Sequence, residues 1–220
     1  MKLLSRLAHD ETGGPAAEFA LVLPVALLFL AGIIDVGRYM WETNRAEKAT
    51  QMGARFAIAT DFVPGGTSEN GLYKYSFAVS SGITQGIPVS ASDFPGVRCD
   101  SNGTAVTCTC KGTCAFDVTG DNAVFSRIVA RMQAFKSDIG PANVVLNYDH
   151  SNLGFSGDPA GADVAPIVTV GLRNMNFVPL TTMLFGGATT MAGASTSNNS
   201  PLGHLTYSLT MEDGQGTYSN

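Results

Sequence analysis

The hydrophobic positions of this chain are concentrated near its N-terminus, where Phe19 to Ile34 run without a charged side chain. With Ala16 and Ala17 before it, this run approaches the ~20 apolar residues that a helix needs to cross a bilayer. Tyr39 and Trp41 follow directly, at the place where aromatic residues gather at a membrane interface. The pattern therefore predicts a membrane-spanning helix over about residues 16–36.

One carboxylate, Glu18, lies at the leading edge of this run. About eleven large apolar side chains, at roughly −0.3 to −0.6 kcal/mol each, outweigh a carboxylate that costs about +2.5 to +3.5 kcal/mol at the bilayer centre and less near its edge. We therefore expect the segment to insert. Because ionisable groups inside membranes are usually functional, we also expect Glu18 to have a role. The alternative is a carboxylate at the membrane edge that has no partner.

Beyond the apolar run the pattern becomes periodic. Apolar and small residues recur at three- and four-residue steps from Val36 to Ala57, which predicts that the membrane helix continues as an amphipathic helix to about residue 60. Pro64-Gly65-Gly66 follows the predicted end of this helix. The outer half of the helix needs a partner for its apolar stripe, and the C-terminal region is the nearest one.

The C-terminal region alternates in short stretches that predict strands. Asn102-Gly103 lies inside one of them and predicts a hairpin, while Asp121 is a predicted N-cap for a helix that Gly140-Pro141 stops. The predicted strands and hairpin are Leu72–Val79, Val97–Thr109, Val144–Tyr148, Ile167–Asn174 and His204–Met211.

We predict an α+β fold, with the long N-terminal transmembrane-plus-amphipathic helix packed on a mainly antiparallel β-sheet domain with one further helix. The predicted divisions are a leader at residues 1–13, the helix at 14–60 and a globular domain at 61–220.

All four cysteines, Cys99, Cys108, Cys110 and Cys114, lie close together. An even number beyond a membrane anchor predicts disulfides in an oxidising compartment, whereas the spacing lacks the paired CxxC pattern of a zinc site. Three pairings of the four cysteines are possible. In one of them, a turn at residues 111–113 lets Cys110 and Cys114 close a tight loop, which leaves Cys99 for Cys108.

Two features of the sequence disagree on which side of the membrane the C-terminal domain lies. Basic residues are more frequent after the apolar run than before it, which favours a cytoplasmic C-terminal domain. The cysteines and the Ser/Thr/Gly-rich C-terminal region favour an extracytoplasmic one, and we adopt this orientation for a single-pass protein of the bacterial cytoplasmic membrane.

Composition and motifs narrow the functions further. A net charge of −5 argues against a nucleic-acid partner. The three histidines, His9, His150 and His204, have no metal-ligand spacing, and no catalytic or nucleotide-binding motif is present, so we expect no enzyme activity, cofactor or metal. Three aspartates, Asp149, Asp158 and Asp163, offer oxygen ligands for calcium, but we interpret them as solvated loop residues because their spacing does not fit an EF-hand.

A family resemblance rests on Gly13, on Glu18-Phe19, on the apolar run ending in GIIDVGR, and on Met52-Gly53-Ala54-Arg55. These features resemble the TadE-like pseudopilins of the tight-adherence (Flp) branch of type IV pilus systems. The resemblance implies that a prepilin peptidase cuts between Gly13 and Gly14. Cleavage would place an α-ammonium group on Gly14, and pairing of Glu18 with the ammonium of an adjacent subunit would set the register between packed helices.

The expected function is that of a minor pilin or pseudopilin that primes, caps or anchors a pilus and works with other pilin-like subunits, the assembly machinery and membrane lipid. An adhesive role for exposed loops is a further expectation. The alternative is a permanently anchored, uncleaved extracytoplasmic binding domain. The apolar stretch Phe177–Phe185 is either core or a partner-binding patch.

Overall fold

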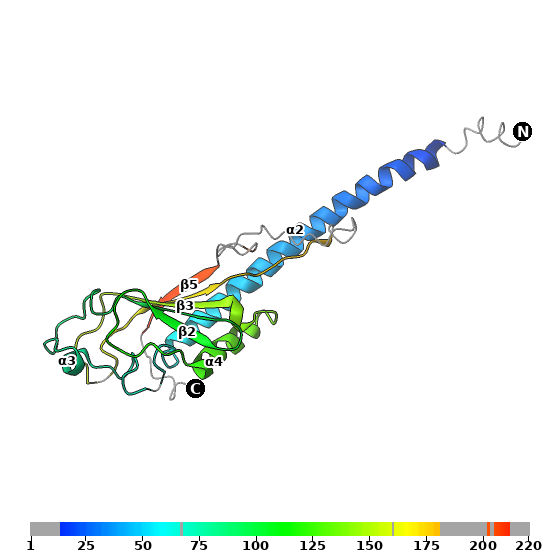
Figure 1. Cartoon of the computed structure of the whole chain (residues 1–220). Helices are drawn as coiled ribbons and strands as arrows, with labels where there is room; N and C mark the ends of the chain where they lie inside the picture. The colour runs from blue at the N-terminus through cyan, green and yellow to red at the C-terminus, as the bar shows by residue number, and fades with distance from the viewer. Residues whose placement is uncertain (1–13, 67, 160, 181–201, 203–204, 212–220) are drawn as a thin grey trace, which may run out of the picture. The chain divides into compact units, whose positions relative to one another are not determined.

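The computed structural model describes residues 14–66, 68–159, 161–180, 202 and 205–211 (Figure 1). Two compact units divide the chain. Within the described residues, the first unit comprises residues 14–41 and 177–180, and the second comprises 42–176, 202 and 205–211. The elements are α2 (Gly14–Ile58), α3 (Phe77–Ser80), β1 (Val97–Ser101), β2 (Val106–Cys110), α4 (Asn122–Gln133), η2 (Pro141–Asn143), β3 (Val144–Asp149), β4 (Ile167–Leu172) and β5 (Thr206–Thr210).

The strands form one antiparallel sheet in the order β2-β1-β3-β4-β5. A long apolar N-terminal helix together with this sheet and further helices confirms the predicted α+β class. The first hairpin is also confirmed, because β1 and β2 pair from Val97↔Cys110 to Ser101↔Val106. Asn102 stabilises its turn, where the side-chain oxygen accepts hydrogen bonds from the backbone N–H groups of Thr104 and Ala105, each at 2.9 Å.

The strand predicted at Leu72–Val79 is wrong. These residues form turns and then the short helix α3, whose N-cap Ser76 accepts a hydrogen bond from Val79 N. The alternation of apolar and polar residues that predicted a strand has another cause: Leu72, Tyr75 and Phe77 are buried in the core. Their backbone follows a turn instead of a ladder, since the N–H of Tyr75 donates to the carbonyl of Gly71 at 2.9 Å.

Helix α4 begins as predicted and ends earlier. The carboxylate of Asp121 caps it by accepting hydrogen bonds from Ala123 N at 2.8 Å and Val124 N at 3.0 Å. The sequence predicts that the helix continues to Gly140-Pro141, but it ends at Gln133. The Gln133 side chain donates to the carbonyl of Ile139 at 2.8 Å, so the following residues fold back in a turn that still buries Ile139.

In the second unit, helix α2 packs against α4 and the sheet. Gly53 marks the closest approach, because a Cβ atom built there would lie 2.8 Å from the side chain of Met132 in α4 and 3.3 Å from Val170 in β4. The same stretch of α2 buries the alanines 46, 49, 54 and 57. Small residues therefore form the buried stripe of the outer half of the helix, and the predicted packing on the sheet is confirmed.

Candidate membrane and assembly surface

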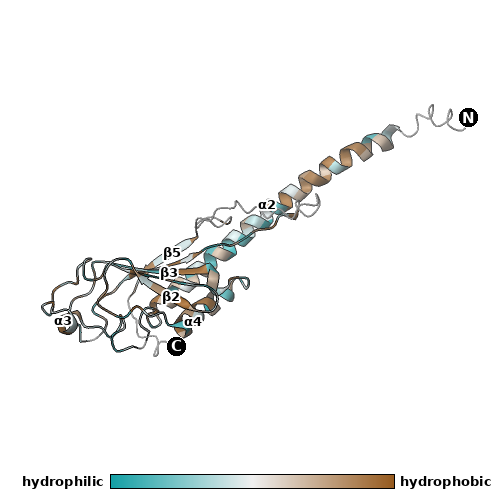
Figure 2. Ribbon diagram, in the orientation of Figure 1, coloured by the Kyte–Doolittle hydropathy of each residue, from teal (hydrophilic) through white to brown (hydrophobic). Residues whose placement is uncertain are grey.

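The N-terminal half of α2 consists mostly of hydrophobic residues (Figure 2), and most of its large apolar side chains are exposed. Leu21 is 76% exposed and Phe29 is 71% exposed. Among the described residues, α2 is the one helix that is long and apolar enough to cross a membrane, and little of its apolar window is buried. Side chains of this kind are stable when lipid or other apolar helices surround them.

The residues expected to act in processing and assembly lie at the start of this helix. Gly14 is its first residue, and Glu18 and Phe19 follow just beyond the first turn, both exposed. Phe19 is 65% exposed. Gly13 lies outside the described residues. The roles of Gly13, Gly14, Glu18 and Phe19 in cleavage and assembly stay predictions.

Where the apolar run ends, Asp35 and Arg38 lie one helical turn apart and form an ion pair of 3.1 Å. Asp35 is only 7% exposed. Its carboxylate also accepts a hydrogen bond from the backbone N–H of Leu180 at 2.7 Å, and Arg38 donates to the carbonyl oxygen of Val178 at 3.4 Å. The ion pair therefore binds the backbone of a segment that lies 140 residues later in the chain.

Aromatic contacts hold the same segment. The ring of Phe177 meets the ring of Tyr39 edge to face, with centroids 5.5 Å apart, and the guanidinium carbon of Arg38 lies 5.3 Å from the Phe177 centroid. The sequence marks Asp35 and Arg38 only as part of the GIIDVGR motif. It does not indicate this contact, because nothing local to the helix points to residues 177–180.

Two disulfides fasten the first hairpin. Cys99 and Cys108 face each other across β1 and β2 and are joined, and Cys110 is joined to Cys114 beyond the end of β2. Of the three pairings that the sequence leaves open, this is the one in which Cys110 and Cys114 close a tight loop. The Cys99–Cys108 disulfide is buried, whereas residues 111–113 between the other two cysteines are exposed.

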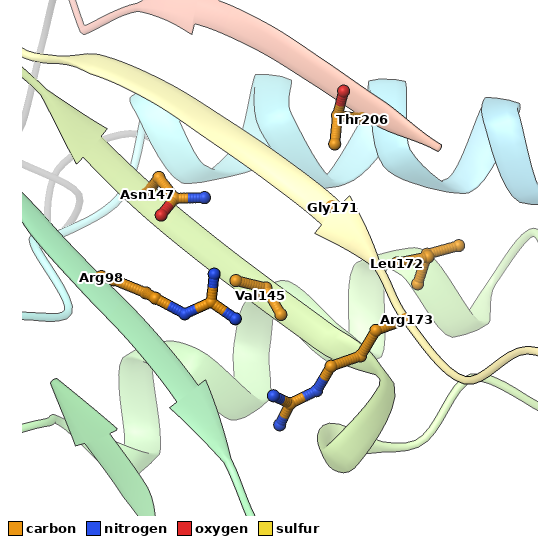
Figure 3. A pocket seen from close by; sticks show the side chains of 7 residues that line it. All are labelled: Arg98, Val145, Asn147, Gly171, Leu172, Arg173 and Thr206. Carbon is orange, nitrogen blue, oxygen red and sulfur yellow. The ribbon is translucent and has the colours of Figure 1, made fainter. Parts of the chain in front are cut away.

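The outer face of the sheet carries a small depression (Figure 3). In this view the ribbons of α2 and α4 lie behind the strands, and Arg98, Asn147 and Arg173 project from the opposite side. Its volume is about 80 Å³, far below the ~300 Å³ at which ligand pockets begin. The residues that line it are Arg98, Val145, Asn147, Gly171, Leu172, Arg173 and Thr206.

The depression has a structural explanation in Arg173. This guanidinium pairs with Asp100 at 2.5 Å and donates to the carbonyl oxygens of Ser101 and Ala142, each at 2.9 Å. It therefore ties β4 to the end of β1 and to η2. The lining residues include no carboxylate, thiol or imidazole, so the depression lacks the groups that act as nucleophile or general base.

The interpretation of Asp163 as a solvated loop residue is wrong. It is 3% exposed, and its carboxylate accepts backbone hydrogen bonds from Phe77 at 2.6 Å, Gly157 at 2.9 Å and Asp158 at 3.0 Å. The cause is a tertiary contact, since Phe77 comes from an element far earlier in the chain. Within the described ranges, no three His, Cys, Asp or Glu side chains gather to hold a metal ion.

The other predicted polar residues lie apart. Asp149 forms an ion pair with Lys111, and the Nε2 atom of His150 lies 2.9 Å from the carbonyl oxygen of Val89. His9 and His204 lie outside the described residues. The structure thus does not bring the aspartates together as a cation site, and it uses Asp149 and Asp163 to hold loops.

Among the described residues, one exposed apolar N-terminal helix points to single-pass membrane anchoring, and a disulfide-bonded α+β domain follows it. Over its N-terminal segment the chain is TadE-like: the model of the TadE-like protein family matches residues 13–55. The match begins at Gly13 and ends at Arg55, the last residue of the MGAR motif, and it confirms the resemblance. No curated protein and no solved structure matches the chain. The family and the apolar helix fit a pilin associated with the tight-adherence pilus.

Proposed function

We propose that this chain is a minor pilin or pseudopilin that a prepilin peptidase cleaves between Gly13 and Gly14. Its N-terminal helix then joins it to other pilin-like subunits, so that it primes, caps or anchors a tight-adherence pilus. The observation that carries this proposal is the exposed apolar surface of residues 14–41, within the segment that matches the TadE-like family. Before assembly, membrane lipid covers the same surface.

Glu18 gives this assembly its specificity. A carboxylate among exposed apolar side chains is costly in hydrocarbon unless a cation neutralises it. Cleavage creates such a cation on Gly14, and the ammonium of one subunit pairs with Glu18 of the next. The neighbouring Phe19 and Leu21, 65% and 76% exposed, supply the apolar contact around this pair.

The domain in this proposal is extracytoplasmic. Its two disulfides support that side of the membrane, because disulfides form and persist in oxidising compartments. The described residues supply no catalytic constellation in the sheet depression, and the family is structural. The proposed function is therefore assembly through the helix.

Cross-linking through Val22→Cys, at a position that is 59% exposed on the same helix, tests the proposal in cells that make the pilus. All four native cysteines are paired, so the introduced thiol is the only free one. We expect a thiol-specific cross-linker to join the full-length variant to pilin-like subunits. Adding Glu18→Ala should remove these products while the protein stays in the membrane fraction at an unchanged level.

The matched control is Gly32→Ala in the same helix, where an added Cβ meets nothing within 4 Å. This change should leave the cross-linked products unchanged. Products that persist at full yield with Glu18→Ala would contradict the role of the carboxylate, and a complete absence of cross-linked subunits would favour the uncleaved binding domain.

A further inference from the structure

The segment Phe177–Leu180 exposes apolar side chains on a backbone that is irregular from Phe177 to Pro179 and helical at Leu180. Residues 177–179 are neither helix nor strand, so regular secondary structure does not satisfy their backbone polar groups. Val178 is 46% exposed and Leu180 is 38% exposed. In lipid, backbone N–H and C=O groups need partners within the protein. Such a segment contacts lipid at low cost only when neighbouring residues supply those partners.

Asp35 and Arg38 supply partners for two of these groups. The Asp35 carboxylate accepts from the N–H of Leu180, and the Arg38 guanidinium donates to the carbonyl of Val178. The residue between them, Pro179, is buried and has no N–H to satisfy. An acceptor and a donor one helical turn apart thus match one N–H and one carbonyl of a segment that exposes its apolar side chains.

These exposed side chains continue the apolar surface of the helix. Tyr39, Met40 and Trp41 come just after Arg38, one helical turn beyond the apolar run, and are 37%, 62% and 65% exposed. Tyrosine and tryptophan are the residues that gather at the membrane–water interface. We call the set Tyr39, Met40, Trp41, Val178 and Leu180 the interfacial collar.

We propose that Phe177–Leu180 is a second membrane-contacting element, which lies in the lipid interface beside α2, with Asp35 and Arg38 as its positioning residues. This inference rests on the proposed membrane anchoring of α2. The ion pair has a role in α2 and in the segment 177–180. In α2, Arg38 offsets the free-energy cost of placing the Asp35 carboxylate in lipid between the exposed Ile34 and Val36. In the segment, the two side chains bind backbone groups.

Fluorescence quenching by lipid tests the proposal. The chain contains one tryptophan, Trp41, which reports on anchoring. A second protein carries Trp41→Phe together with Val178→Trp, so that its only indole is in the segment. Both full-length proteins are reconstituted in phosphatidylcholine vesicles with acyl chains brominated near the head group. We expect the indole of the Val178→Trp protein to be quenched to a similar extent as Trp41 in the native chain.

The matched control places the indole in the domain, as Ile87→Trp in the Trp41→Phe background. The exposed fraction of Ile87, 49%, is similar to that of Val178, 46%. Brominated lipid should leave an indole at position 87 unquenched. If Trp41 is quenched while Val178→Trp behaves like Ile87→Trp, the inference is overturned and anchoring stands. If Trp41 itself is unquenched, the anchoring fails, and the inference fails with it. Leu180→Trp repeats the test at a second position.

The same quenching measurement tests whether Asp35 positions the segment. In the Val178→Trp protein, Asp35→Ala should abolish most of the quenching, because the segment loses its acceptor and its ion pair. Asp35→Asn keeps an oxygen that accepts from Leu180 N, and it should restore much of the quenching. Equal quenching in the Ala and Asn variants and in the parent protein would overturn the role of Asp35.

Discussion

Single polar residues hold this fold where they bind backbone groups of distant segments. Asp163 binds three backbone N–H groups, and the hydroxyl of fully buried Tyr148 accepts a hydrogen bond from the N–H of Val63 at 3.3 Å. Burial raises the pKa of Tyr148 well above its ordinary value. A buried polar group that loses its hydrogen-bond partner lowers the free energy of unfolding far more than an exposed one does. Substitutions of these residues should therefore have measurable effects on stability.

Tyr148→Phe should lower the free energy of unfolding by about 1 kcal/mol at neutral pH, because Val63 N loses its acceptor. Since the pKa of Tyr148 is raised in the folded state, the unfolded chain releases its proton first as pH rises above about 10. Stability attributable to this residue is therefore intact below pH 10 and falls above it by up to about 1.4 kcal/mol per pH unit. Tyr148→Phe should remove this part of the alkaline loss.

Urea unfolding of the full-length protein in detergent micelles, followed by circular dichroism at several pH values, checks both effects. The control is Tyr73→Phe, because Tyr73 and Tyr148 both pack on Phe62, with centroids at 6.3 and 5.8 Å. Tyr73 is less buried than Tyr148. An alkaline slope that is identical in native and Tyr148→Phe proteins would refute the argument.

Lys136 is the clearest buried cation, with a side chain only 4% exposed. It pairs with Glu42 of α2, and with Asp138 at 2.9 Å. Glu42→Ala should therefore lower the free energy of unfolding by about 1–3 kcal/mol, because a buried charge loses one of its partners. Unfolding by urea measures this loss.

The control Glu47→Ala, on the exposed surface of the same helix, should change stability by less than about 0.5 kcal/mol. Adding Lys136→Met to Glu42→Ala should recover most of the loss, because an apolar side chain fits a buried site without a counter-ion. A double variant that is less stable than Glu42→Ala alone would count against this explanation.

At the scale of elements, α2 is one continuous helix with two kinds of surface. Its first part exposes large apolar side chains, and its last turns bury alanines and Gly53 against α4 and β4. This explains the MGAR motif physically. Gly53 and Ala54 are buried where only small side chains fit, and Arg55 is exposed in the last turn, where a cation suits the helix dipole.

The disulfides predict an order of reduction in the first hairpin. Cys110–Cys114 should open first under mild reductant, because the residues between its cysteines are exposed while Cys99 and Cys108 are buried. Alkylation followed by mass spectrometry identifies the free thiols. Early labelling of Cys99 and Cys108 would contradict the prediction.

Replacing either pair with alanines should cost roughly 2–3 kcal/mol, the loop-closure value for short loops. Urea unfolding of the two double variants, each compared with the native protein, measures this cost. A double variant as stable as the native protein would show that its disulfide does not stabilise the hairpin.

Across the whole molecule, local patterns predicted most of the fold. The apolar run, Asn102-Gly103 and the Asp121 cap gave α2, the first hairpin and the start of α4, because each signal lies within its own element. The sequence could not reveal that Asp163 binds Phe77 or that Asp35 binds Leu180. Those contacts join residues far apart in the chain. The strand predicted at Leu72–Val79 is wrong for a similar reason. Tertiary packing buries apolar residues of a turn, and their spacing resembles the alternation of a strand.

The central claim is that this chain is a processed pilus subunit, and the intact mass with the N-terminal sequence tests it most directly. The full-length protein is expressed with and without an active prepilin peptidase in the same cells, beside a Gly13→Leu variant. We predict a chain that begins at Gly14 only when the peptidase is present and Gly13 is intact. A chain that keeps Met1 in every case would contradict the account and favour a permanently anchored binding domain.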